Sequence, residues 1–293
     1  MKIVVGVDAS KRAATIGGYI SALRFADYEL TLAHVLERIG EAGFSPEGGV
    51  PRDLIERFLK MQEDEANGIL QSEHAELKKA GLESSKKLLT GFSGNRIVAY
   101  AEETKADVLA IGSSGKGTLE GAIIGSVGRK ALISSSCSVL IAKRPVQSQG
   151  PLTVVFATDH SDYANRCIDR FIGWRPKGVG RAIVTTIYPE QFVQAMTSVM
   201  DNFKADVSSW VRTEFERNNQ KVLQRLAPLG AACKSRVESG NVGNVLENVM
   251  KEEKADLLVL GAQGHGFMQR LMLGSVSLDQ ALKRPYSVLV MRV

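Results

Sequence analysis

Short apolar runs alternate with longer amphipathic stretches along the whole chain. In the first half, β-branched and other apolar residues predict buried strands at 3–7, 30–35, 108–111 and 139–142. The run at 84–89 is more polar and predicts a strand nearer a sheet edge. The stretches between the strands predict helices at 10–25, 52–80, 95–104 and 127–133. This alternation is typical of an α/β fold, in which helices cover both faces of a parallel sheet.

Turn-forming residues mark the ends of several elements. The segment 40–51 is rich in glycine and proline and predicts a loop, and Gly81 is placed to end the long helix. Serine is a residue type that caps helices, so we expect Ser10 to begin the first helix. In the second half, strands are predicted at 154–157, 182–187, 232–237, 257–260 and 287–291.

The two halves of the chain repeat each other. Residues 3–10 (IVVGVDAS) match 154–161 (VVFATDHS), and residues 106–112 (ADVLAIG) match 255–261 (ADLLVLG). Two matches in the same order and at nearly one offset indicate two copies of a single unit. We therefore predict two domains, 1–145 and 151–293, joined by the polar, proline-bounded linker 144–151.

A glycine pattern, G-x2-G-x9-G-S, follows the fourth strand of each copy. Its members are Gly112, Gly115, Gly125 and Ser126 in the first copy, and Gly261, Gly264, Gly274 and Ser275 in the second. Glycine lets backbone amides approach a ligand closely, and a serine at a helix start offers free amides to an anion. If strands one and four are neighbours, Asp8 faces the same crevice at the switch point of the sheet. A nucleotide needs this combination of an acceptor and an anion site.

The complete pattern, found twice, resembles the universal stress protein family over the whole chain. The resemblance implies tandem open five-stranded parallel sheets of the Rossmann-like, adenine-nucleotide alpha hydrolase-like type, with ATP bound in the subgroup that has this motif. It assigns the nucleotide contacts to Asp8, Val35, Gly112, Gly115, Gly125, Ser126 and Val127, and to their counterparts Asp159, Ile187, Gly261, Gly264, Gly274, Ser275 and Val276. Mg²⁺ or Mn²⁺ is expected only through the phosphates, because neither copy offers an acidic cluster.

The resemblance also bears on assembly and activity. Family members often pair through their last strands, so residues 139–142 and 287–291 are expected to join the two copies as an intramolecular pseudo-dimer; a further homodimer and unidentified protein partners stay open.

We expect a nucleotide-dependent stress-response or signalling protein without conventional catalysis. The alternatives are an interaction module with vestigial sites and a slow ATP-hydrolysing enzyme. Enzymes of the same fold use S-G-G-x-D-S or H-I-G-H motifs, and neither occurs here.

Simpler roles compete at each site. The glycines could serve only as turns, and Asp8 and Asp159 could merely cap the first helix of each copy. Lys116 either contacts a phosphate or is a solvated loop lysine, and His265 is expected to be a loop residue. The Gly-Lys-Gly-Thr run at 115–118 lacks the spacing of a P-loop.

Composition narrows the remaining classes of function. The net charge of +5 is spread along the chain rather than clustered, which argues against nucleic-acid binding. Three cysteines without a CxxC pair, Cys137, Cys167 and Cys233, are expected to be small buried hydrophobes in a reducing compartment. Trp174 and Trp210 are expected to serve in packing rather than in a site. No apolar stretch predicts a signal peptide or membrane span, so a cytoplasmic protein is expected.

Overall fold

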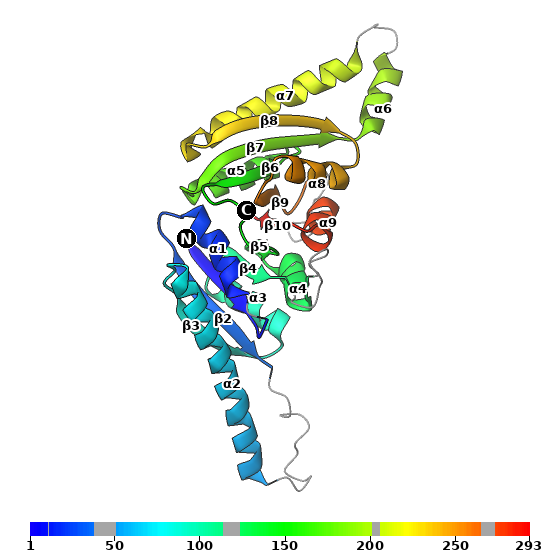
Figure 1. Cartoon of the computed structure of the whole chain (residues 1–293). Coiled ribbons are helices and arrows are strands. Elements are labelled where there is room, and N and C mark those ends of the chain that lie inside the picture. Colours follow the sequence, from blue (N-terminus) through cyan, green and yellow to red (C-terminus); the bar gives the residue numbers. More distant parts are fainter. Residues whose placement is uncertain (11, 38–50, 114–123, 201–205, 265–272) are drawn as a thin grey trace. The chain divides into compact units, whose positions relative to one another are not determined.

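The computed structural model describes residues 1–10, 12–37, 51–113, 124–200, 206–264 and 273–293. Its contacts divide the chain into two compact units. Unit 1 comprises Met1–Ser21 and Asp27–Pro145, and unit 2 comprises Ala22–Ala26 and Val146–Val293 (Figure 1). None of the helices in the described ranges combines the length and the apolar character that crossing a bilayer requires.

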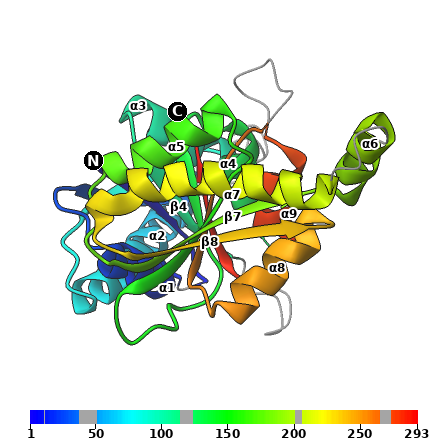
Figure 2. The same ribbon diagram turned by 90° about the horizontal axis from the view of Figure 1, so that it is seen from above.

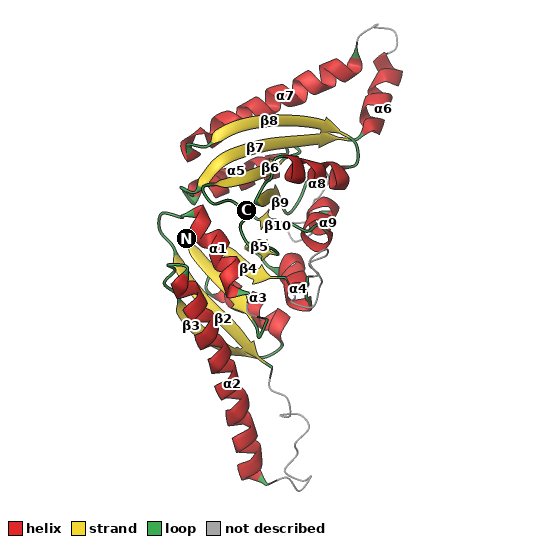
Figure 3. Ribbon diagram, viewed as in Figure 1, coloured by secondary structure: helices red, strands yellow, loops and turns green. Residues whose placement is uncertain are grey.

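Unit 1 alternates strands and helices, as the apolar pattern predicts (Figure 3). Its elements are β1 (Lys2–Val7), α1 (Ala13–Leu23), β2 (Glu29–Leu36), α2 (Arg52–Lys79), β3 (Ser85–Thr90), α3 (Ser93–Glu103), β4 (Val108–Gly112), α4 (Ser126–Ser134) and β5 (Ser138–Ala142). The strands are parallel and lie in the order β3-β2-β1-β4-β5. The expected loop at 40–51 lies almost wholly outside the described residues.

Unit 2 repeats this arrangement, with one helix more than the described residues of unit 1 contain. Its elements are β6 (Leu152–Ala157), α5 (Asp162–Gly173), β7 (Val179–Tyr188), α6 (Glu190–Met200), α7 (Val207–Leu226), a 3₁₀ turn (Ala227–Leu229), β8 (Ala232–Ser239), α8 (Val242–Glu252), β9 (Leu257–Gly261), α9 (Ser275–Lys283) and β10 (Ser287–Met291). The parallel order β8-β7-β6-β9-β10 matches that of unit 1. Helix α6 projects beyond the sheet (Figure 2). No helix was predicted at this position from the sequence.

Helices cover both faces of each sheet. In unit 2, α5 packs against α7 on one face, and α8 packs against α9 on the other (Figure 2). In unit 1, α3 packs against α4, and a methyl group added at Gly17 of α1 would lie 2.8 Å from Leu77 of α2. The central strands are buried along almost their whole length, whereas β3 and β8 are largely exposed, as expected of edge strands.

Three expectations about single residues are wrong. Helix α1 begins at Ala13 rather than at Ser10, whose amide bonds to Asp8 instead. Cys233 is exposed because it lies on the edge strand β8. Trp210 is 52% exposed on α7 and does not pack in the interior. Trp174, Cys137 and Cys167 are buried, as expected.

A charged network covers the outer edge of unit 2. Glu253 at the end of α8 is buried and accepts hydrogen bonds from Arg181 at 2.9 Å and from Lys234 at 2.6 Å. Arg236 on β8 reaches Glu253 at 3.3 Å and Glu252 at 2.7 Å. Burial alone would raise the pKa of Glu253, but the bonds from Lys234 and Arg181 and the charge of Arg236 lower it below the ordinary value of 4.5.

We predict that Glu253→Gln makes unit 2 less stable in a pH-dependent way. A carboxyl with a lowered pKa contributes stability above its unfolded pKa, and this contribution disappears as the pH falls through the folded value. The variant should therefore lose about 1–2 kcal/mol at pH 7, and its difference from the wild type should shrink below about pH 4.5. Both tryptophans lie in unit 2, so urea unfolding followed by tryptophan fluorescence reports on this unit.

The exposed pair of Glu214 and Arg217 on α7 provides the matched control. Glu214→Gln should change stability by less than about 0.5 kcal/mol at either pH, because exposed ion pairs contribute little. A pH-independent loss in Glu253→Gln would show that the charge of Glu253 is unimportant.

Candidate functional site

The site lies where the strand order of each sheet reverses. In unit 1, β1 pairs with both β2 and β4, and in unit 2, β6 pairs with both β7 and β9. The first and fourth strands of each copy are therefore neighbours, as the sequence argument requires. Crevices beyond the carboxyl ends of such strands are the usual ligand sites of open α/β sheets.

Unit 1 has a cavity of about 340 Å³ at this place. Six of the seven predicted residues line it, namely Asp8, Val35, Gly112, Gly125, Ser126 and Val127. The seventh, Gly115, lies outside the described residues, as does Lys116. The cavity opens on the side of the sheet that α3 and α4 cover, because Ser93 and Ile97 of α3 complete its wall.

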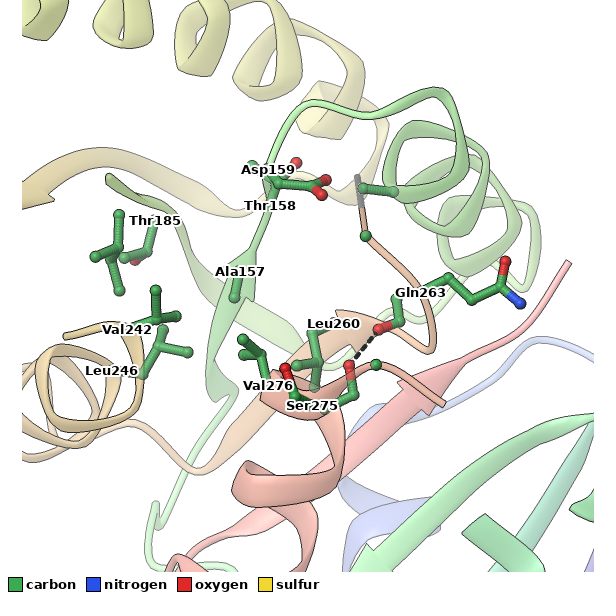
Figure 4. Close-up of a pocket in the computed structure, with 16 residues that line it drawn as sticks. Ala157, Thr158, Asp159, Thr185, Val242, Leu246, Leu260, Gln263, Ser275 and Val276 are labelled. Carbon is green, nitrogen blue, oxygen red and sulfur yellow. Dashed lines mark hydrogen bonds between the residues drawn. The ribbon is translucent and has the colours of Figure 1, made fainter. Parts of the chain in front are cut away.

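Unit 2 has a cavity of about 260 Å³ at the equivalent place (Figure 4). All seven predicted residues line it, namely Asp159, Ile187, Gly261, Gly264, Gly274, Ser275 and Val276. Sequence similarity alone supported the assignment of Ile187 only weakly. The strand register supports it: Gly6 pairs with Ala33, and its counterpart Ala157 pairs with Thr185. Two residues further along β2 and β7, Val35 and Ile187 therefore occupy equivalent positions. His265 lies outside the described residues.

Some wall residues were not predicted from the sequence. Thr185 of β7 and Val242 and Leu246 of α8 line the cavity of unit 2 (Figure 4). A shared pattern could have found the α8 residues, because 91–95 (GFSGN) matches 240–244 (GNVGN) across the starts of α3 and α8. Gly91 and Gly240 in this pattern have φ of 138° and 127°, which favours glycine.

The two aspartates are fixed by tight turns rather than by helix capping. One carboxylate oxygen of Asp8 accepts the Ser10 amide at 2.8 Å. In the same way, Asp159 accepts the amide and hydroxyl of Ser161 at 3.0 and 2.7 Å. Ser161 itself caps α5 by accepting the Ala164 amide. These bonds hold each carboxylate at the end of a central strand.

A buried glutamate caps the start of α1 from another helix. Glu73 on α2 is 1% exposed, and its carboxylate accepts the Ala13 amide at 2.8 Å. A negative charge at a helix N-terminus is favourable because of the helix dipole. Helix α2 thus fixes the start of α1 and the loop that contains Asp8.

The motif glycines leave room for neighbouring side chains. A methyl group added at Gly264 would lie 2.8 Å from the second carboxylate oxygen of Asp159. Added at Gly112 it would lie 2.5 Å from Cβ of Arg12, and added at Gly261 it would lie 3.3 Å from the ring of Tyr163. From the sequence we expected these glycines to permit close approach of a ligand. In the structure they also make room for residues at the start of the first helix of each unit or just before it.

Two short helices begin at the cavities with amides that have no acceptor within the helix. Gly125 and Gly274 precede α4 and α9, and neither helix has a side-chain cap or an acidic residue in its first turn. The first helical bond is donated by Arg129 in α4 and by Leu278 in α9. The three amides before each donor therefore have no acceptor within the helix, and together with the dipole they favour an anion.

The fold and these cavities define a tandem α/β protein of the doubly wound type, with a ligand crevice at the switch point of each sheet. The chain belongs to the universal stress protein family, whose sequence model matches residues 1–143 and again residues 152–292. Membership of this family supports a role in the stress response.

Individual relatives agree with the family assignment. Universal stress protein MJ0531 of Methanocaldococcus jannaschii is 30% identical over 145 residues, which cover 49% of this chain and 82% of the relative. Universal stress protein Sll1388 of Synechocystis is 26% identical over 134 residues, which cover 42% of this chain and 86% of the relative.

Solved structures show the same tandem fold. A universal stress protein from Archaeoglobus fulgidus superimposes with a TM-score of 0.69 at 17% identity, covering 99% of this chain and 98% of the other. A protein of unknown function from Pseudomonas aeruginosa PAO1, PA1789, gives 0.58 at 15% identity over 99% of this chain and 92% of the other.

Proposed function

We propose that this chain is an ATP-binding stress-response protein in which each unit holds one nucleotide. The observation that supports this most is the convergence of a strand-end carboxylate, motif glycines and a helix N-terminus on one cavity in each unit. Asp8 and Asp159 would accept hydrogen bonds from the ribose or the base, and Val35 and Ile187 would contact the base. The amides at the starts of α4 and α9 would receive the phosphates.

We further propose that Mg²⁺ or Mn²⁺ enters together with the nucleotide. Mg²⁺ commonly binds through one or two carboxylates and the phosphates of its substrate. Among the described residues that line each cavity, Asp8 or Asp159 is the one carboxylate, so the metal would take most of its ligands from the phosphates.

Binding without conventional turnover is the activity we propose. The experiment is a calorimetric titration of the full chain with ATP and Mg²⁺, with phosphate release measured on the same samples. We expect saturable binding and phosphate release no faster than in a denatured control. Steady turnover would favour the slow ATP-hydrolysing enzyme, and absence of binding would favour an interaction module with vestigial sites.

We predict that Gly264→Ala weakens ATP binding at unit 2 by about tenfold or more. The added methyl group, 2.8 Å from the Asp159 carboxylate, must displace either that side chain or the glycine loop. The effect should be measured by titration of a chain whose unit 1 site is disabled by Ser126→Asp. Gly150→Ala is the control, because no atom lies within 4 Å of its added methyl group. Equal affinity in both variants would contradict the assigned role of Gly264.

A further inference from the structure

Arg12 is a charged wall residue of the unit 1 cavity that the sequence argument did not single out. It directly precedes α1, where its carbonyl accepts the first helical bond, from Ile16 at 3.1 Å. The stem of Arg12 crosses Gly112, because a methyl group added there would lie 2.5 Å from Cβ and 2.9 Å from Cγ of Arg12. The first glycine of the motif therefore positions this arginine at the cavity.

The guanidinium of Arg12 has unused hydrogen-bonding capacity. Its Nε is buried and has no hydrogen-bond partner within the described part of the chain. An arginine has five N–H donors in a planar fork and keeps its charge at all physiological pH values. A buried donor without an acceptor is costly, so an anionic ligand in the cavity would relieve that cost.

The equivalent position in unit 2 has no charge. Tyr163 packs over Gly261 in the way that Arg12 packs over Gly112, and its hydroxyl contacts the Met291 carbonyl at 3.5 Å. Burial raises the pKa of Tyr163 to about 12, so the phenol is neutral at pH 7. The unit 2 cavity also has Val242 in its wall where the unit 1 cavity has the polar Ser93. Asp159 is the charged residue among those lining the described part of this cavity.

We propose that Arg12 determines phosphate specificity, so that the unit 1 site prefers a nucleoside triphosphate to a monophosphate more strongly than the unit 2 site does. This inference rests on the proposed nucleotide binding. A guanidinium binds phosphate oxygens in a bidentate, charge-assisted manner, and it gains more from the larger charge of a triphosphate. Unit 2, with Tyr163 at this position, would hold the phosphates through the α9 amides without a guanidinium and would therefore distinguish a triphosphate from a monophosphate less.

The test compares ATP with AMP on full-length chains in which one site is disabled. Ser275→Asp leaves only unit 1, and Ser126→Asp leaves only unit 2. Adding Arg12→Gln to the Ser275→Asp chain retains the Cβ, Cγ and Cδ stem over Gly112 and removes the guanidinium. ATP binding should then weaken by about tenfold or more, while AMP binding changes by less than about threefold. Arg12→Lys should weaken ATP binding less than Arg12→Gln does.

Two further comparisons complete the test. Arg129→Gln removes an exposed positive charge from α4 and should leave the ratio of ATP to AMP affinity unchanged. The Ser126→Asp chain should show a ratio at least about tenfold smaller than the Ser275→Asp chain. Equal losses for ATP and AMP, or no loss, in Arg12→Gln would overturn the inference while the proposed nucleotide binding stands. Absence of any nucleotide binding in the two parent chains would overturn both.

Discussion

The double variant Ser126→Asp/Ser275→Asp is expected to lose ATP binding, with an affinity at least about 100-fold below that of the wild type. Each aspartate would place a negative charge in the first turn of α4 or α9, where the account locates the phosphates. Opposing like charges at a binding site cost several kcal/mol, and about 3 kcal/mol corresponds to about 100-fold. Calorimetric titration with ATP and Mg²⁺ measures the loss.

The fold should survive this change, because an acidic residue in the first turn of a helix interacts favourably with the helix dipole. Thermal unfolding of the double variant should therefore match that of the wild type. Ser208→Asp is the matched control, since it adds the same charge to the first turn of α7, away from both cavities. If the double variant binds ATP as the wild type does, the phosphates do not lie at these helices.

The second large effect concerns an aspartate of the repeated Ala-Asp pattern. Asp256 is 1% exposed and accepts the amides of Gln147, Ser148 and Thr153 at 3.2, 3.1 and 2.9 Å, and the Ser148 hydroxyl at 2.5 Å. It thereby fixes part of the linker and the start of β6 to the rest of unit 2. Asp256→Asn would turn an amide donor toward several donors, so we expect unit 2 to lose about 3 kcal/mol.

A loss of this size corresponds to a fall of roughly 6–12 °C in the melting temperature of a unit of this size. Tryptophan fluorescence follows it selectively, because Trp174 and Trp210 both lie in unit 2. Asp107→Asn provides the comparison, since Asp107 is the repeat counterpart, is less buried and accepts the Lys2 amide at 2.8 Å. Far-UV circular dichroism, which follows the unfolding of both units, should show the Asp256 variant as the more destabilised of the two, each compared with the wild type. Equal, small losses would contradict this role of the linker contacts.

Periodicity was sufficient for the order and type of the elements in unit 1, because each strand or helix has a local apolar pattern. The repeat located the two cavities, since Asp8 and Gly112 end adjacent strands and their counterparts do the same. The Ala-Asp motif was recognised as part of the repeat, but its structural role was not predicted. Asp256 bonds to residues more than 100 positions away, which no local pattern reveals.

Contacts between distant segments explain the remaining differences. Glu73 caps α1 from 60 residues away in the chain. The local sequence around Ser10 therefore gave no sign that a distant residue would cap this helix. Arg12, just before α1, and Tyr163, in the first turn of α5, contact the first motif glycine of their units, which lies about 100 residues further along the chain. The pairing of residues 139–142 with 287–291 in an intramolecular pseudo-dimer stays a prediction.

The most direct test of the central claim is the number of ATP molecules bound at saturation, measured by equilibrium dialysis of the full-length chain with labelled ATP and Mg²⁺. Because both units have the carboxylate, motif glycines and a helix start without a side-chain cap at one cavity, we predict two ATP per chain. Ser126→Asp and Ser275→Asp should each reduce this number to one. A wild-type chain that binds no ATP at saturation, or single variants that still bind two, would contradict it.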